Sequence, residues 1–198
     1  MKKILVINSS VSQENNSDSL EMSKLFVNEY QKLHFDDQII YLDLNEISMS
    51  QKTLTRNNIQ TFFNQEDSFK FIEQLKSIDK IILNFSMINY SIPAILKNFI
   101  DHITIANLSF TYKGSKDGKA IGMLSNIENV QLLATKGGTN TPNGAFTDYV
   151  KNIWEFLGAK VTVPIINEMM DMPPYNEQTS LKNIEKVRDD ILKAARLF

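Results

Sequence analysis

Short runs of aliphatic and β-branched residues alternate along the chain with longer stretches in which apolar residues recur at helical spacing. Each short run has four to six residues, most of them apolar, which is typical of strands buried on both faces of a parallel sheet. The runs are Ile4–Ile7, Ile39–Leu42, Ile81–Phe85, Val130–Ala134 and Val161–Ile166. This alternation predicts an α/β fold in which helices cover both faces of one sheet.

The longer stretches supply the predicted helices, at Leu20–Lys32, Glu66–Ser77, Ala94–Ile103, Ala145–Leu157 and Leu181–Phe198. Because parallel strands are joined by right-handed crossovers, helices reach both faces of the sheet when the first strand lies near its centre. We therefore expect a doubly wound sheet of five strands in the order 2-1-3-4-5, which is a flavodoxin-like architecture.

Two segments do not follow the alternation. Leu44–Asn64 is polar, whereas in Leu108–Gly122 the aromatic residues Phe110 and Tyr112 alternate ahead of a loop that contains glycine. The second pattern predicts a hairpin, and its apolar residues project from a domain that is complete without them, which favours a homodimer interface. The 198 residues contain no repeat or domain boundary, so we expect a single domain over residues 1–198.

The composition limits the partners and the chemistry. Lys and Arg number 21 against 23 Asp and Glu, a formal charge of −2, so no basic field is present to hold nucleic acid or an anionic membrane. The chain has no cysteine and two histidines, which excludes thiolate chemistry and a histidine-rich metal site. No apolar run approaches the roughly 18 residues that span a bilayer, and the apolar part of the N-terminus is too short for a signal peptide, so we expect a cytoplasmic protein.

In a doubly wound sheet, ligands bind beyond the carboxyl ends of the strands, near the point where the strand order reverses. After the first strand, residues 8–19 are rich in hydroxyl and amide side chains and run into a helix, whose free N–H groups favour an anion. The loop lacks the lysine of a nucleoside-triphosphate loop and the glycines of a dinucleotide fingerprint, so a monophosphate fits better. The same residue types are the preferred caps of any helix, and this loop alone leaves both interpretations open.

The loops after the third and fourth strands differ from the first. Residues 86–94 mix apolar and amide side chains, so a flat ring could pack there, although the apolar ones also suit the cap of a core. Residues 135–140 contain two glycines, which allow close approach of a ligand, and Lys136, which can meet developing negative charge. An ordinary glycine turn with a solvated lysine is the alternative.

Six short motifs lie in register along the whole chain. They are Ser9–Ser10, Ser17–Ser19, Met87–Tyr90, Leu96–Asp101, Ser109–Tyr112 and Thr135–Gly138. Each motif is weak on its own, but in this order and after these strands they resemble the motifs of the FMN-dependent NADH-azoreductases, also described as NADH:quinone oxidoreductases. Ile88 stands where that family usually has Tyr, and Lys136 where it often has Arg.

The resemblance implies noncovalently bound FMN, reduced by NADH or NADPH, and transfer of two electrons to quinones or azo compounds in a ping-pong cycle. The residues implied around the FMN phosphate are Ser10, Ser17, Asp18 and Ser19. Those implied along the isoalloxazine are Met87, Ile88, Asn89 and Tyr90 on one edge and Thr135, Lys136, Gly137 and Gly138 on the other. Phe110, Tyr112 and Phe156 would form the substrate walls, in a homodimer with the flavin near its interface. No catalytic side chain is required, because the cofactor carries the chemistry.

Several expectations accompany this interpretation. Asp18 should offer its backbone N–H to the phosphate and turn its carboxylate to solvent, because like charges repel. His34 and His102 are expected at the surface near helix ends, without a catalytic role. Two other functions stay open: a flavodoxin-type electron carrier, against which the small net charge counts, and a hydrolase using Ser9 or Ser10, for which no nearby base is evident.

Overall fold

A computed structural model describes residues 1–13, 16–139 and 145–198. Of the loops predicted to bind a ligand, residues 14, 15 and 140 lie outside the described ranges. The described residues form one sheet of five parallel strands, namely β1 (Lys3–Asn8), β2 (Gln38–Asp43), β3 (Lys80–Ser86), β6 (Asn129–Lys136) and β7 (Ile165–Glu168). Their order is β2-β1-β3-β6-β7, which confirms the predicted order 2-1-3-4-5.

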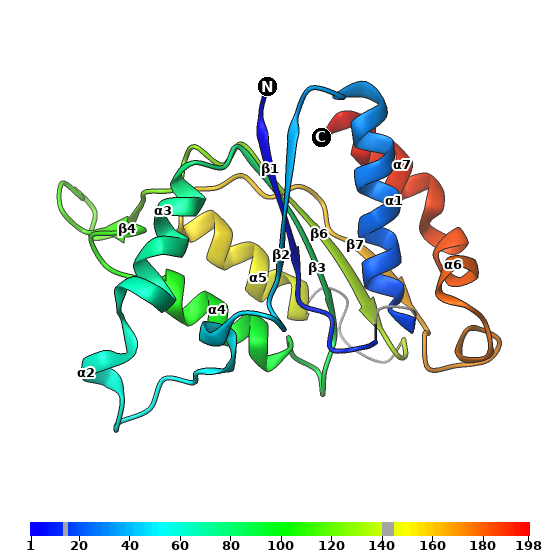
Figure 1. Ribbon diagram of the computed structural model, residues 1–198, viewed down its shortest axis with the longest axis horizontal. Coiled ribbons are helices and arrows are strands. Elements are labelled where there is room, and N and C mark those ends of the chain that lie inside the picture. Colours follow the sequence, from blue (N-terminus) through cyan, green and yellow to red (C-terminus); the bar gives the residue numbers. More distant parts are fainter. Residues whose placement is uncertain (14–15, 140–144) are drawn as a thin grey trace.

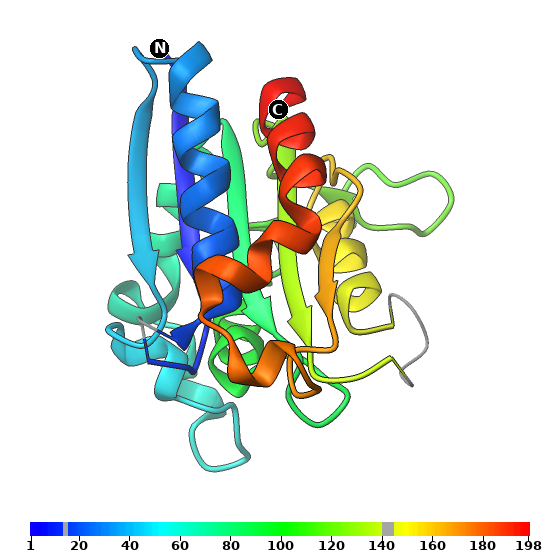
Figure 2. The ribbon, with the colours of Figure 1, turned by 90° about the vertical axis from the view of Figure 1, so that its right-hand side faces the viewer.

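Helices cover the sheet on both sides, and Figure 1 shows the two layers to the left and right of the strands. One layer contains α1 (Asp18–Leu33), α6 (Ser180–Asn183) and α7 (Arg188–Leu197), and Figure 2 shows α1 and α7 side by side over the sheet. The other layer contains α3 (Lys70–Lys76), α4 (Ala94–Ile103) and α5 (Ala145–Phe156). Both chain ends lie at the end of the sheet opposite the strand arrowheads (Figure 2).

The central strands β1, β3 and β6 bury both of their faces, as their apolar runs predict. β2 is an edge strand and is only partly buried, with Tyr41 70% exposed. In β1, Ile4 and Val6 pack against the layer that contains α1, whereas Leu5 and Ile7 pack against the layer that contains α4 and α5. All four side chains are at most 3% exposed. The result is two apolar cores separated by the sheet, which hold the carboxyl ends of the strands in fixed positions.

The fifth strand begins later than predicted. Residues 161–164 run beside β6 with a single isolated bridge, from Val130 to Val161, and the regular strand starts at Ile165. Pro164 has no N–H to give to a ladder, which accounts for the late start. The predicted helix over Leu181–Phe198 is likewise interrupted, because a 3₁₀ turn, η5 (Ile184–Val187), separates α6 from α7.

The two segments that did not follow the alternation form short elements. Leu44–Asn64 contains a 3₁₀ turn, η2 (Ser48–Gln51), and one helical turn, α2 (Ile59–Phe62). A π-helical turn, η3 (Gln65–Phe69), then leads into α3.

The predicted hairpin is present, because β4 (Phe110–Thr111) and β5 (Ile121–Gly122) pair antiparallel. It projects from the side of the molecule that α3, α4 and α5 cover (Figure 1).

Candidate functional site

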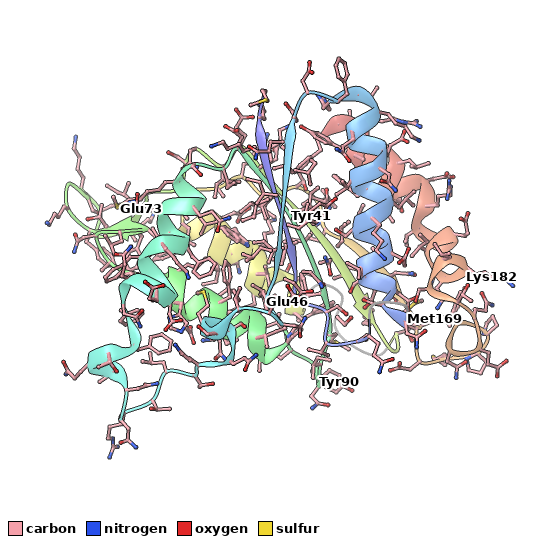
Figure 3. All side chains as sticks on the ribbon, viewed as in Figure 1. Tyr41, Glu46, Glu73, Tyr90, Met169 and Lys182 are labelled. Carbon is pink, nitrogen blue, oxygen red and sulfur yellow. The ribbon has the colours of Figure 1, made fainter. Side chains whose placement is uncertain are left out.

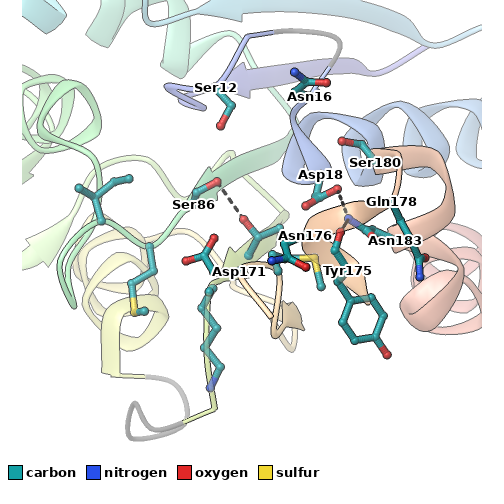
Figure 4. A pocket seen from close by; sticks show the side chains of 16 residues that line it. Ser12, Asn16, Asp18, Ser86, Asp171, Tyr175, Asn176, Gln178, Ser180 and Asn183 are labelled. Atoms are coloured by element: carbon teal, nitrogen blue, oxygen red, sulfur yellow. Dashed lines mark hydrogen bonds between the residues drawn. The ribbon is translucent and has the colours of Figure 1, made fainter. Parts of the chain in front are cut away.

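A cavity of about 570 Å³ lies at the carboxyl ends of the central strands, where the strand order reverses. Four segments line it: the loop after β1 with the start of α1, the loop after β3, the end of β6, and the segment after β7 (Figure 4). The lining residues are Ser12, Asn16, Asp18, Ser86, Met87, Ile88, Thr135, Lys136, Gly137, Met170, Asp171, Tyr175, Asn176, Gln178, Ser180 and Asn183. The site is therefore polar, with apolar side chains contributed mainly by the loop after β3.

The serines predicted around a phosphate lie together at the start of α1. Ser17 caps the helix, because its Oγ accepts from the N–H of Leu20 at 3.3 Å. The Ser10 and Ser17 hydroxyls are 2.7 Å apart, and Ser19 Oγ is 3.4 Å from Ser17 Oγ. All three are buried, and the cavity lining beside them consists of Ser12, Asn16 and Asp18. The same atoms thus serve both as a helix cap and as a cluster of hydroxyls at an anion-favouring helix end.

Asp18 does not turn its carboxylate to solvent, so that expectation is wrong. Asp18 Oδ1 accepts a hydrogen bond from Asn183 Nδ2 at 3.2 Å, and Figure 4 shows the two side chains pointing toward each other. Asn183 ends α6 and is 3% exposed. The carboxylate is therefore held against α6 by a residue 165 positions away, which local sequence could not indicate.

The loop after β3 divides its four predicted residues. Met87 and Ile88 line the cavity, whereas Asn89 and Tyr90 occupy a tight turn with φ of 48° and 65°. Mutual backbone hydrogen bonds between Ile88 and Ser91 close the turn. Positive φ at both central residues is the backbone of a type I′ turn, and it is costly for tyrosine. Tyr90 is 70% exposed and points away from the molecule at the end where the strands finish (Figure 3).

The end of β6 supplies the polar floor of the cavity. Thr135 Oγ1 donates to Ser86 Oγ at 2.8 Å, which joins the ends of β6 and β3. The Lys136 side chain is 1% exposed and its Nζ lies 3.5 Å from Glu168 Oε2 on β7. The alternative in which Lys136 is solvated is therefore wrong, because its side chain is buried and its ammonium group is paired with Glu168.

The two glycines after β6 have different surroundings. A Cβ built on Gly137 would lie 1.9 Å from Asp171 Oδ2, so the Asp171 carboxylate rests directly on this glycine. The Asp171 N–H also donates to the Gly137 carbonyl at 3.1 Å. Among the described residues, nothing lies within 4 Å of a Cβ built on Gly138, so none of them blocks the approach of a ligand to the backbone there.

The segment after β7 was missed by the sequence interpretation. It contributes Met170, Asp171, Tyr175, Asn176, Gln178, Ser180 and Asn183 to the cavity, and Tyr175 belongs to a 3₁₀ turn, η4 (Tyr175–Glu177). Met169, at the same end of the molecule in Figure 3, has a φ of 72°. Because every strand of a parallel sheet ends at the same edge, the loop after the fifth strand belongs with the others. Its sequence carries no motif that would have singled it out.

The predicted substrate residues lie together but apart from this cavity. The rings of Phe110 and Phe156 are 4.8 Å apart and those of Phe110 and Tyr112 are 5.8 Å apart, at the junction of the hairpin with the end of α5. None of the three is among the lining residues. Tyr112 is 60% exposed and Phe156 is 36% exposed.

His102 is not at the surface, which corrects that expectation. It is fully buried, its ring stacks on Phe62 with centroids 3.7 Å apart, and its Nδ1 is 2.9 Å from Ser68 Oγ. Burial lowers the pKa of His102 by penalising the charged imidazolium. His34 is half-buried and caps the end of α1.

The hydrolase alternative finds no support in the positions of the two serines. Ser9 Oγ donates to the Asn84 carbonyl at 2.8 Å, and Ser10 Oγ pairs with the Ser17 hydroxyl. Within the described residues, neither hydroxyl has a histidine or carboxylate partner of the kind that activates a nucleophile.

Two kinds of structure are absent from the described residues. No group of three or more His, Cys, Asp or Glu side chains there could hold a metal ion. Among the described helices, none has the length and apolar character needed to cross a membrane.

The sheet order, the cavity at the switch point and the hydroxyl-rich start of α1 define a protein of flavodoxin-like fold, and the chain belongs to that family, whose model matches residues 2–191. Within the family, it is 74% identical over 199 residues to the FMN-dependent NADH:quinone oxidoreductase 2 of Mesoplasma florum, with 100% of both chains covered. The family expected from the six motifs is thereby confirmed.

Two solved structures share the fold over nearly the whole chain. An azoreductase from Bacillus anthracis has a TM-score of 0.79 at 21% identity and covers 100% of both chains. An FMN-dependent NADH-azoreductase from Bacillus anthracis in complex with FMN has a TM-score of 0.74 at 21% identity and covers 98% of each chain.

Proposed function

We propose that this chain transfers two electrons from NADH or NADPH to quinones and azo compounds through noncovalently bound FMN, in a ping-pong cycle at one shared pocket. Membership of the family makes the chain an oxidoreductase with FMN as its cofactor. The acceptor and the order of steps are the proposed part. The observation that carries most weight is the full-length match to an NADH:quinone oxidoreductase, in a fold whose cavity lies where such folds bind ligands.

The residues of the cavity fit the parts of FMN. The first turn of α1, with its cluster of serine hydroxyls, suits a phosphate dianion. Asn183 lines the cavity with an Oδ1 that has no hydrogen-bond partner among the described residues. A buried acceptor of this kind is normally satisfied by water or by a ligand, so this wall of the cavity is suited to face a bound group. The apolar side chains of Met87 and Ile88, which line the cavity together with Gly137, suit a flat ring.

Bound FMN supplies hydride acceptance and the return of two electrons, so no side chain of the chain has to act as a nucleophile. The role of the protein is to bind the cofactor and to stabilise the negative charge that develops on it. In the proposed site, negative charge on a reduced ring would be stabilised by the N–H groups of Gly137 and Gly138 and by the ammonium group of Lys136. Glu168, 3.5 Å from Lys136 Nζ, limits the positive potential that Lys136 provides.

A homodimer is part of the proposal. Exposed apolar residues surround the hairpin, among them Tyr112, Ile121 and Met123, and such patches are usual at interfaces. Phe110, Tyr112 and Phe156 do not line the cavity of their own chain. In the proposed dimer, these residues of one copy would contact the ligand bound in the cavity of the other copy. Sedimentation of the FMN-loaded protein at micromolar concentration should give the dimer mass, and a monomer with FMN still bound would contradict this part of the proposal.

We also place the protein in the cytoplasm, which cell fractionation would test.

Initial-rate kinetics test the ping-pong cycle. NADH and a soluble 1,4-naphthoquinone are varied together with FMN-loaded protein, and the double-reciprocal lines should be parallel because NAD leaves before the quinone binds. The same measurement with NADPH gives the preference between the two donors. Lines that intersect would show that both substrates bind at once and would overturn the shared-pocket cycle.

An electron carrier of the flavodoxin type is disfavoured, because the relatives are named as NADH:quinone oxidoreductases.

A further inference from the structure

Asn183 links the segment after β7 to the first residue of α1. Its Nδ2 donates to Asp18 Oδ1 at 3.2 Å and to the Tyr175 carbonyl at 3.0 Å. The backbone carbonyl of Asn183 accepts from Asn167 Nδ2 at 3.1 Å. Asn183 is 3% exposed, and its amide nitrogen has partners in two segments, the start of α1 and the turn at Tyr175. Asn183 belongs to none of the six sequence motifs and was not among the residues predicted to bind FMN.

The position of Asp18 explains why this link matters. Asp18 follows the capping residue Ser17 and lines the cavity, so its carboxylate lies at the helix end where an anion would be received. A carboxylate at the first position of a helix is attracted to the free N–H groups of the first turn. Left unrestrained, the Asp18 carboxylate would compete for those groups and repel a phosphate.

We propose that Asn183 is a positioning residue for phosphate binding: it holds the Asp18 carboxylate toward α6 and so keeps the N–H groups of the first turn of α1 available to the anion. In the described residues, Leu20 N–H is taken by Ser17 Oγ, and the one side-chain partner recorded for Asp18 is Asn183. The inference rests on the proposed function in taking the FMN phosphate as the anion.

The test compares FMN with riboflavin, which has the same ring and ribityl chain but no phosphate. Dissociation constants are measured by quenching of flavin fluorescence for the wild type, Asn183→Ala, Asp18→Asn and the double variant. Asn183→Ala should weaken FMN by about tenfold, which corresponds to about 1.4 kcal/mol of binding free energy, and should leave riboflavin within about twofold. In the double variant, FMN affinity should return to that of Asp18→Asn alone, because the repelling charge is gone.

Asn176→Ala is the matched control, since Asn176 is an exposed amide from the same segment that also lines the cavity. It should change the ratio of FMN to riboflavin affinity by less than about twofold. Asn183→Ser withdraws the donor from Asp18 but keeps a polar side chain, and it serves the same comparison if the alanine variant does not fold.

Two results would overturn the inference. Equal losses of FMN and riboflavin in Asn183→Ala would mean that Asn183 supports the wall of the cavity only, and a double variant as weak as Asn183→Ala would mean that Asp18 is not involved. Failure of the wild type to bind either flavin would instead refute the proposed cofactor, so the two failures are distinguishable.

Discussion

Replacement of Ser17 by alanine should separate the two roles that its hydroxyl has at the start of α1. Ser17 Oγ accepts from the Leu20 N–H and lies 2.7 Å from Ser10 Oγ. Loss of a capping hydrogen bond costs about 1 kcal/mol of unfolding free energy. Removing the partner of a buried hydroxyl costs about 1 kcal/mol more. We therefore expect Ser17→Ala to lower the unfolding free energy of the flavin-free protein by about 2 kcal/mol, as measured by urea denaturation.

The effect on flavin binding should depend on the phosphate. A hydrogen bond to a charged acceptor is worth about 1.5–3 kcal/mol, so the dissociation constant for FMN should rise by roughly tenfold or more, whereas that for riboflavin should stay nearly constant. Asn64→Ala is the matched control, because Asn64 caps η3 by accepting from the N–H groups of Glu66 and Asp67 at 3.0 and 2.9 Å and does not line the cavity. Asn64→Ala should lose comparable stability and no FMN affinity. If Ser17→Ala weakened FMN and riboflavin equally, or if Asn64→Ala weakened FMN as much, the hydroxyl cluster would not be the phosphate site.

Three further predictions concern charge and packing. Burial lowers the pKa of His102 below its ordinary value of 6.5, so the unfolding free energy should be highest above that pH. It should fall as the pH drops through 6.5 toward the folded pKa, by up to about 1.4 kcal/mol per pH unit. In urea denaturation, His102→Gln should flatten this slope and His34→Gln should preserve it. Lys136→Met should lower the FMN midpoint potential by some tens of millivolts, at about 30 mV per 1.4 kcal/mol. Glu168→Gln, which removes the charge of its partner, should raise the potential. If both variants shifted the potential in the same direction, measured against a reference dye, Lys136 would not be the cation that stabilises the reduced flavin. Gly137→Ala should weaken FMN in a fluorescence titration, because its Cβ must displace the Asp171 carboxylate. Gly138→Ala should change FMN affinity less, because its Cβ would meet no atom of the described residues within 4 Å.

The sheet was predictable because each buried strand is a short apolar run in the sequence. The right-handedness of the crossovers between parallel strands then indicates the strand order. The orientation of Lys136 was also within reach: Leu132 and Ala134 are buried in one core cluster, and the period of two in a strand places Lys136 on the same face. The start of the fifth strand was misplaced because Val161 and Val163 extend the apolar run on the N-terminal side of Pro164. Pro164 cannot donate to a ladder, so the regular strand begins only at Ile165.

The remaining errors come from contacts between distant segments. His102 was expected at the surface because it lies near the end of its helix, but Phe62 and Ser68, from a segment without a clear pattern, cover it. The contact of Asp18 with Asn183 joins residues 165 positions apart. Hydrophobic periodicity describes one element at a time, so it cannot indicate which polar side chains from two loops will meet.

The most direct test of the central claim is an anaerobic visible titration of the FMN-loaded protein. One equivalent of NADH per bound flavin should bleach the yellow absorption near its visible maximum, and one equivalent of a 1,4-benzoquinone should then restore it. Both steps should occur while the flavin stays bound on gel filtration. A protein that cannot be loaded with FMN, or one whose bound FMN is indifferent to NADH, would contradict the account.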